Sequence, residues 1–222
     1  MRNFHHFLNK LACALIAVIA ISGCFEPLDN NILSSNPNQV VYAKKAKKVK
    51  KAKRAKKHAK KSAKKTKKVN ASTDWRWPKP KATVYLDLDG NKNLLSASDE
   101  AIKTWNDTGA FTFVKTKNKK NADITVEQVY SPNTNYAGYT TFHYYVKSGL
   151  LFSADTKLNT YYLDNFSSYN YSYERVVNTV EHELGHAIGL KHNNGQSVMY
   201  PTGSIYPIQD IDIQNVKKLY AN

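Results

Sequence analysis

Cysteine is almost absent from this chain. The 222 residues include two cysteines, Cys13 and Cys24, and both lie among the first 24 residues. The rest of the chain can therefore form no disulfide bond and offers no thiolate to a metal ion. A metal site in that part would have to use histidine or carboxylate ligands.

Long hydrophobic runs are also missing. The apolar stretch at residues 11–22 has twelve residues, whereas a membrane-spanning helix needs about 20. Positive charges at Arg2 and Lys10 precede it, and this combination is typical of an export signal. We therefore expect the protein to leave the cytoplasm and to carry no further membrane span.

The end of the apolar stretch allows more than one maturation route. The sequence Ile21-Ser22-Gly23-Cys24 resembles a bacterial lipobox, which favours lipidation at Cys24 and anchoring at the cell surface. Two alternatives stay open. Cleavage after Ala43 would give free secretion, and Cys24 can be an ordinary residue of the signal. Both export routes predict an extracellular location.

Acidic residues are missing from one long basic tract. Residues 44–68 hold 16 of the 33 lysines and arginines and no aspartate or glutamate. The rest of the chain then has 17 basic and 17 acidic residues, so the formal charge of +16 belongs to this tract. It has almost no apolar side chains to bury, which predicts disorder.

The tract predicts either adhesion to polyanions or a solvated spacer. Suitable partners outside a cell are anionic wall polymers and anionic membrane surfaces, which lysine binds by releasing counterions. The tract also lacks aromatic residues that would stack on bases, so specific recognition of nucleic acid is not expected.

Composition divides the chain into four parts. Residues 1–24 form the signal or lipobox-like segment, residues 25–43 a tether rich in Asn, Ser and Pro, residues 44–72 the basic tract, and residues 73–222 one folded domain. Alternating and β-branched residues in that domain predict strands at 81–88, 111–116, 122–129, 136–146 and 151–159.

Helices and connections are predicted by other signals. Ser96-x-x-Asp99 is a capping-box pattern ahead of a helix that carries Trp105 and ends at Gly109. Residues 87–91 indicate a turn rather than a calcium loop, because the remaining calcium ligands are lacking. Residues 161–173 are expected to be a loop, and a closing helix is predicted within residues 208–220.

A helix is also predicted to begin near Ser172, with Val177, Val180, Leu184 and Ile188 as its apolar stripe. It carries His182-Glu183-Leu184-Gly185-His186, and two histidines four residues apart lie on one face of a helix. His192 can join them only if the helix ends first, and Gly189 favours that end. Three surface histidines on a helix are the alternative, but five fixed positions favour a zinc site.

The spacing His182-Glu183-x-x-His186-x-x-Gly189-x-x-His192, followed by Ser-Val-Met-Tyr-Pro at 197–201, resembles the metzincin zinc peptidases. The order of elements over residues 82–220 is similar to the matrixin branch, in a bacterial form. This resemblance implies an α+β fold in which a twisted five-stranded mixed sheet is combined with an active-site helix, a backing helix and a C-terminal helix.

The resemblance also implies roles for individual residues. His182, His186 and His192 would bind one catalytic zinc ion, Glu183 would be the general base, and Met199 would form an apolar floor beneath the imidazoles. A substrate cleft is expected at Gly138, Tyr139, Thr140, Thr141, Tyr200 and Pro201. A second, structural zinc is not expected, because its region offers only His143.

The combined expectation is a secreted or surface zinc endopeptidase that acts, as a monomer, on protein or peptide substrates. The alternative is a surface protein that binds polyanions and carries an inactive peptidase fold. The intact histidine set and Glu183 favour the enzyme.

Overall fold

The computed structural model describes residues 16–22, 74–164, 169 and 171–221, the first of these stretches by its backbone alone. The expected lipidation site at Cys24, the tether at 25–43 and the basic tract at 44–68 lie outside the described residues. Within the described part, no helix has the length and apolar character needed to cross a membrane.

The described strands form one mixed sheet in the order β1-β5-β6-β4-β2-β3. Strands β3, β2, β4 and β6 run parallel to one another, whereas β5 is antiparallel to β6, and β1 is antiparallel to β5. The bounds are β1 (Ile16–Ser22), β2 (Lys81–Asp87), β3 (Thr112–Lys115), β4 (Ile124–Val129), β5 (Gly138–Tyr145) and β6 (Leu150–Asn159).

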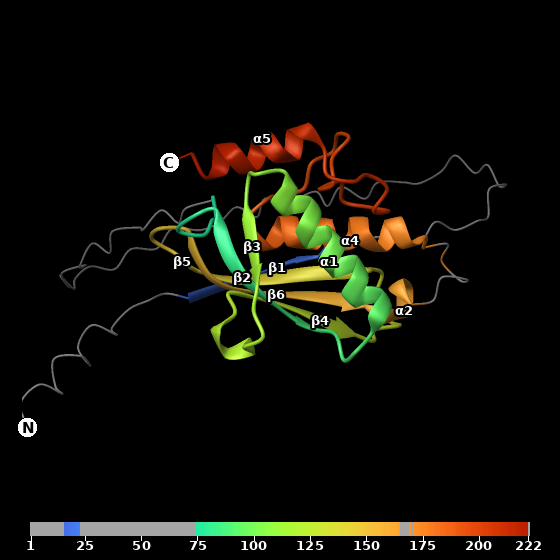
Figure 1. Ribbon diagram of the computed structural model, residues 1–222. Helices are drawn as coiled ribbons and strands as arrows, with labels where there is room; N and C mark the ends of the chain where they lie inside the picture. Colours follow the sequence, from blue (N-terminus) through green and yellow to red (C-terminus); the bar gives the residue numbers. More distant parts are fainter. Residues whose placement is uncertain (1–15, 23–73, 165–168, 170, 222) are drawn as a thin grey trace, which may run out of the picture. The chain divides into compact units, whose positions relative to one another are not determined.

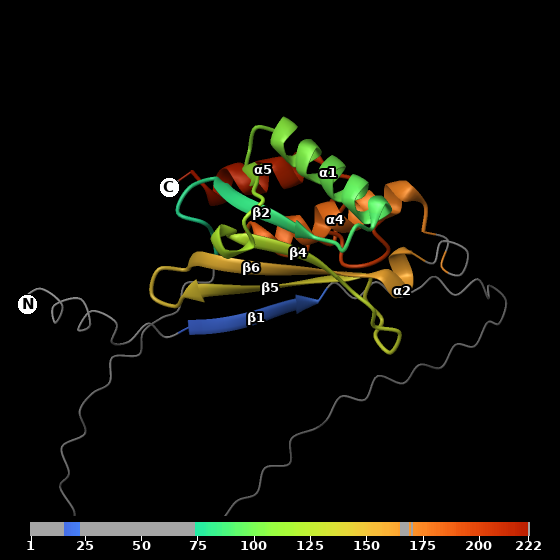
Figure 2. The ribbon, with the colours of Figure 1, turned by 60° about the horizontal axis from the view of Figure 1, so that its bottom comes forward.

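The expected α+β fold with a five-stranded mixed sheet is confirmed by strands β2 to β6. Strand β1 adds a sixth strand beside β5, at the edge of the sheet (Figures 1 and 2). It is formed by part of the stretch that the sequence indicates as an export signal, a role that stays a prediction.

The described helices are α1 (Lys92–Asp107), α2 (Thr160–Leu163), α4 (Tyr173–Ala187) and α5 (Asp210–Leu219). The short helix α2 lies within the stretch expected to be a loop, so that expectation is wrong at its start. Helices α1 and α4 lie on the same side of the sheet (Figure 2). The Trp105 indole of α1 donates a hydrogen bond to the Glu181 carbonyl of α4 at 3.0 Å, which joins the two helices.

The start of α1 corrects the expected capping box. The side chain of Asn91 accepts a hydrogen bond from the Leu94 amide at 3.1 Å, so Asn91 is the N-cap and Ser96 lies inside the helix. The expected turn before it is present, with Asp89 and Gly90 at φ 45° and 72°. The chain thus turns sharply from β2 into α1.

Helix α4 is buried along most of its length. Ser172 caps it, and Val177, Val180, Leu184 and Ile188 are all buried, as the apolar stripe predicted. Burial on every side means that its polar residues lie inside the protein rather than on its surface. This helix therefore carries its histidines into a desolvated environment.

The chain leaves α4 by a sharp turn at Gly189, which has a φ of +104°. A β-carbon there would collide with the Trp75 carbonyl oxygen, so only glycine fits both the conformation and the space. The Trp77 indole donates to the Ala187 carbonyl at 2.9 Å and satisfies one of the last carbonyls of the helix. The predicted end of the helix at this glycine is confirmed.

Candidate metal centre

Three histidines converge at the end of α4. The ring centroids of His182 and His186 are 4.7 Å apart, and those of His182 and His192 are 5.3 Å apart. The Nε2 atoms of His186 and His192 are separated by 3.1 Å. One potential ligand atom from each of the three side chains lies within 4.8 Å of the others. The turn at Gly189 thus brings the third histidine back to the first two.

Backbone carbonyls orient two of the rings. The Nδ1 atom of His182 lies 2.7 Å from the Val198 carbonyl oxygen, and the Nδ1 atom of His186 lies 3.0 Å from the Leu190 carbonyl oxygen. Because a carbonyl only accepts hydrogen bonds, each Nδ1 carries the proton and each Nε2 keeps its lone pair. This arrangement presents Nε2 as the ligand atom, which suits a metal.

Burial keeps the imidazoles neutral. It lowers the pKa of His182 to about 3 and holds that of His186 well below its ordinary value. Desolvation also lowers the pKa of the more exposed His192. Three neutral imidazoles at neutral pH are the ligand set of catalytic zinc sites that leave a fourth position open.

The zinc ion fits these residues. Two nitrogens bound tetrahedrally at the usual Zn–N distance of about 2.0–2.1 Å would be about 3.3 Å apart, close to the separation of the His186 and His192 Nε2 atoms. Among the described residues, this is the one group of histidine, cysteine or carboxylate side chains found close enough to hold a metal ion.

Glu183 is fully buried beside this group. The Thr140 hydroxyl lies 2.8 Å from its Oε2 atom, while its Oε1 atom has no hydrogen-bond partner among the described residues. Burial raises the pKa of Glu183 to about 8, against the lowering effect of the Thr140 hydrogen bond. A buried, partnerless carboxylate oxygen is costly to keep unless a ligand or water completes it.

Strand β5 approaches Glu183 very closely. A β-carbon at Gly138 would lie 2.8 Å from the Glu183 Cγ atom and 2.9 Å from its Oε1 atom. Gly138 and Thr140, both predicted cleft residues, therefore form the wall behind Glu183. The side chains of Tyr139 and Thr141, also predicted for the cleft, are half-buried on the alternate positions of β5.

The methionine turn, residues 197–201, is held in place by the buried carboxylate of Asp212. Asp212 of α5 accepts hydrogen bonds from the Ser197 hydroxyl and from the Val198 amide, the latter at 2.9 Å. The Val198 carbonyl then holds His182, so α5 positions a histidine through this turn. Met199 is buried, and a β-carbon at Gly185 would collide with its sulfur atom. Its role as a floor stays a prediction.

The segment 201–207 is tied to α4 by polar contacts. The Arg175 guanidinium donates to the Gly203 carbonyl at 2.8 Å, and the Asn178 amide donates to the Ser204 carbonyl at 3.0 Å. At its start, the rings of Tyr200 and Tyr206 pack edge to face at 5.8 Å. Tyr200 and Pro201, the other predicted cleft residues, thus belong to a braced segment.

Sequence reasoning missed several of these supports. Asp212, the contact between Thr140 and Glu183, and the close approach of Gly138 join elements that are far apart in the chain. The closing helix predicted within residues 208–220 contains Asp212, but nothing in that pattern indicates the contact of its carboxylate. His143 lies 3.1 Å from the Ser153 hydroxyl and belongs to no metal-ligand group of the described residues.

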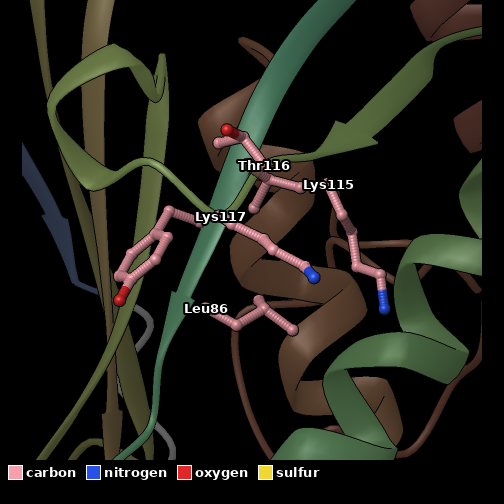
Figure 3. A pocket seen from close by; sticks show the side chains of 6 residues that line it. Leu86, Lys115, Thr116 and Lys117 are labelled. Carbon is pink, nitrogen blue, oxygen red and sulfur yellow. The ribbon is translucent and has the colours of Figure 1, made fainter.

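One hollow on the surface lies apart from the histidines. It has a volume of about 440 Å³ and lies between β2 and the end of β3, lined by Val84, Tyr85, Leu86, Lys115, Thr116 and Lys117 (Figure 3). The Lys115 ammonium is already paired with Asp99 at 2.8 Å. None of the lining residues belongs to the histidine group, so the hollow is separate from the candidate site.

Comparisons with known proteins agree with this geometry. The family model described as matrixin, Peptidase_M10, matches residues 83–221. The matched range contains the three histidines, Glu183 and the methionine turn. A search of curated proteins returned no match.

Proposed function

This chain belongs to the matrixin family of metallopeptidases, and from that premise we propose that it is a zinc-dependent endopeptidase. His182, His186 and His192 would hold the ion, and Glu183 would be the general base. The observation that carries the proposal is the convergence of three neutral imidazoles next to a buried carboxylate with one oxygen left without a partner.

The reaction divides between the ion and the protein. Zinc, when bound, would polarise the scissile carbonyl and lower the pKa of a water molecule to about 7, so that hydroxide is available to attack the carbonyl carbon near neutral pH. Glu183 takes the proton from the attacking water and passes it to the leaving amine. A bound cation beside the carboxyl would favour the ionised form that takes the proton, whereas burial favours the protonated form that holds the proton between these two steps.

The remaining residues orient the reactants. The Thr140 hydroxyl holds Oε2 of Glu183, and Oε1, which has no hydrogen-bond partner among the described residues, would be the oxygen available to the attacking water. An extended peptide would add to the edge of β5 through main-chain hydrogen bonds. The segment 201–207 would form the wall of a side-chain pocket, held in place by Arg175 and Asn178.

The test of this chemistry is Glu183→Gln. The amide keeps the shape of the side chain but cannot accept the proton, so zinc content should stay near one ion per chain while peptide hydrolysis falls by at least about a thousandfold. Glu174→Gln, at an exposed position in the first turn of α4, is the matched control and should retain activity. Metal analysis of each purified variant gives the zinc content, and digestion of a peptide library, with a reaction lacking protein as the blank, gives the hydrolysis. Hydrolysis retained by Glu183→Gln would contradict the assignment.

We further propose that the protein acts outside the cell and that residues 44–68 attach it to anionic wall polymers or membrane surfaces. Support comes from the signal-like N-terminal sequence and from the concentration of positive charge in the tract. Retention of the full chain on teichoic acid should fall steeply between 50 and 200 mM salt, by about tenfold or more. A variant with eight of the tract's lysines replaced by glutamine should bind more weakly and show a smaller salt dependence. Unchanged retention would contradict the proposal.

A further inference from the structure

Strand β1 pairs with β5, the strand whose residues Gly138 and Thr140 contact Glu183. It runs antiparallel to β5 from Ile16 opposite Tyr145 to Ser22 opposite Tyr139, and stops one residue short of Gly138. Figure 2 shows β1 as the outermost strand beside β5. The segment thus approaches the candidate site with its C-terminal end, at Ser22.

The covered edge belongs to the site through its first residues. The Thr140 hydroxyl contacts Oε2 of Glu183, and the Gly138 backbone lies against the Glu183 side chain. A chain paired with this part of β5 therefore pairs directly with Thr140, which contacts the carboxylate. Its direction is fixed as well, because antiparallel pairing makes it run towards Gly138.

The hydrogen-bonding directions follow from the register. The Asn159 amide donates to the Ala137 carbonyl at 2.8 Å, so residues 137, 139 and 141 direct their backbone groups towards β6. Thr140 and Phe142, which alternate with them, direct theirs towards β1. Thr140 is opposite Ile21, and Phe142 is opposite Ile19, so the backbone groups of these two isoleucines bond to β5.

The residues between these partners face the other way. The amides of Val18 and Ala20 point away from β5, because strand residues alternate in the direction of their backbone groups. The neighbouring residues Val18 and Ile19 thus differ in whether the backbone amide donates a hydrogen bond to β5. This difference allows a matched test.

We propose that residues 16–22 are an intramolecular occupant of the peptide-binding edge of β5. While the segment is attached, its main chain uses the hydrogen-bonding groups that an extended peptide would need. Removal of the segment, as the signal-like sequence predicts for export, frees the edge. The pairing itself stands on the register, whereas its effect on hydrolysis rests on the proposed function.

The test uses the full chain, with residues 1–23 retained and the mass verified. Ile19→Pro removes an amide of the ladder and places the proline ring against the Phe142 carbonyl, while Val18→Pro alters an amide that points away. Amide hydrogen exchange should become at least about tenfold faster at Thr140 and Phe142 in Ile19→Pro, the effect of losing about 1.4 kcal/mol of pairing. Val18→Pro should retain the protection.

Two residues of β5 serve as internal references. The amides of Tyr139 and Thr141 bond to β6 and should stay protected in both variants. Equal exchange at Thr140 and Phe142 in the wild-type chain and in Ile19→Pro would overturn the proposal. Equal acceleration by Val18→Pro and Ile19→Pro would overturn it too, since the effect would then not depend on the ladder.

Hydrolysis gives the second readout. In Ile19→Pro, kcat/KM for an extended peptide should rise about fivefold or more over the wild-type full chain, mainly through KM, because the edge is released more often. Unchanged kcat/KM in an active zinc-loaded chain would overturn the occupant role. If no variant cleaves any peptide while the exchange pattern holds, the peptidase proposal fails and the pairing stands.

Discussion

Glu183 has almost no freedom of movement, because the backbone of β5 leaves no room beside it. The α-carbon of Gly138 faces the side chain so closely that even a methyl group would lie 2.8 Å from Cγ. Glu183 is fully buried and cannot swing into solvent to escape the contact. The position of Glu183, the proposed general base on α4, therefore depends on the lack of a side chain at Gly138 of β5.

Replacing this glycine tests that dependence. Gly138→Ala should displace the Glu183 carboxylate and lower kcat by about 10- to 100-fold, since misplacement by about 1 Å can cost about that much. Zinc content should be unchanged, because the residue touches no histidine in the contacts of the described chain. Gly195→Ala, in an exposed turn, is the control and should stay within about twofold. Wild-type kcat in Gly138→Ala would contradict the proposed position of the base.

The metal-ligand candidates and the residues that support them differ in how well the sequence predicts them. His182, Glu183, His186 and His192 could be predicted because their spacing on one helix and its terminal turn encodes their convergence. The supports could not, since Gly138, Thr140 and Asp212 act across the fold and their spacing carries no period.

Among the elements, α4 carries the site and two tryptophans hold it. The Trp105 indole donates to the Glu181 carbonyl, and the Trp77 indole donates to the Ala187 carbonyl. These carbonyls come from the part of the helix that bears the histidines. The indoles thus link the helix to α1 and to the segment before β2.

Trp77→Phe should lower the free energy of unfolding by about 1–3 kcal/mol more than a tryptophan-to-phenylalanine change without a hydrogen bond. Trp75→Phe provides that control, because the Trp75 indole nitrogen is buried without a hydrogen-bond partner among the described residues. Denaturant unfolding of both variants and the wild-type chain gives the difference. Equal costs for the two changes would show that the bond to Ala187 contributes nothing.

Strands β4 and β6 are joined by charge as well as by their ladder. Glu127 of β4 pairs with Lys157 of β6 and with Lys119, and these bonds hold the pKa of Glu127 below its ordinary value. A carboxyl whose pKa falls on folding stabilises the protein above its unfolded pKa. That stability is lost as the pH falls through the lower, folded pKa.

Glu127→Gln should therefore lower the Tm at pH 7, and the difference from the wild-type chain should vanish at acidic pH. Measurements in a chelator at both pH values remove any contribution of metal binding. The effect is expected to be small, because the pair is partly exposed. A Tm difference of the same size at pH 7 and well below pH 4 would contradict the linkage.

Element boundaries were predicted with mixed success. Strands β2 to β6 and helices α4 and α5 follow from alternating and helical apolar patterns. The predicted N-cap of α1 was wrong. Ser96 matches the capping pattern, but the helix already begins at Lys92, with Asn91 as its cap. Strand β1 was not expected, since its apolar run has no alternation and its partner lies more than a hundred residues away.

In the whole molecule, the excess positive charge and the candidate histidine site lie in different parts of the chain. The excess of positive charge lies in residues 44–68, outside the described residues, whereas the histidine site lies in the near-neutral remainder. The matrixin match covers residues 83–221 and leaves the N-terminal third to attachment and export, as proposed. Two described parts of that N-terminal third nevertheless contact the domain, namely strand β1, which pairs with β5, and the segment before β2, which carries Trp75 and Trp77.

The proposed function depends on one metal ion that the three imidazoles of His182, His186 and His192 would bind. X-ray absorption at the zinc edge of the purified full chain, with the zinc content measured on the same sample, tests this most directly. We expect one zinc ion per chain with three imidazole nitrogens at about 2.0–2.1 Å and one oxygen neighbour. Sulfur neighbours, a shell made of oxygen alone, or far less than one zinc ion per chain would contradict it.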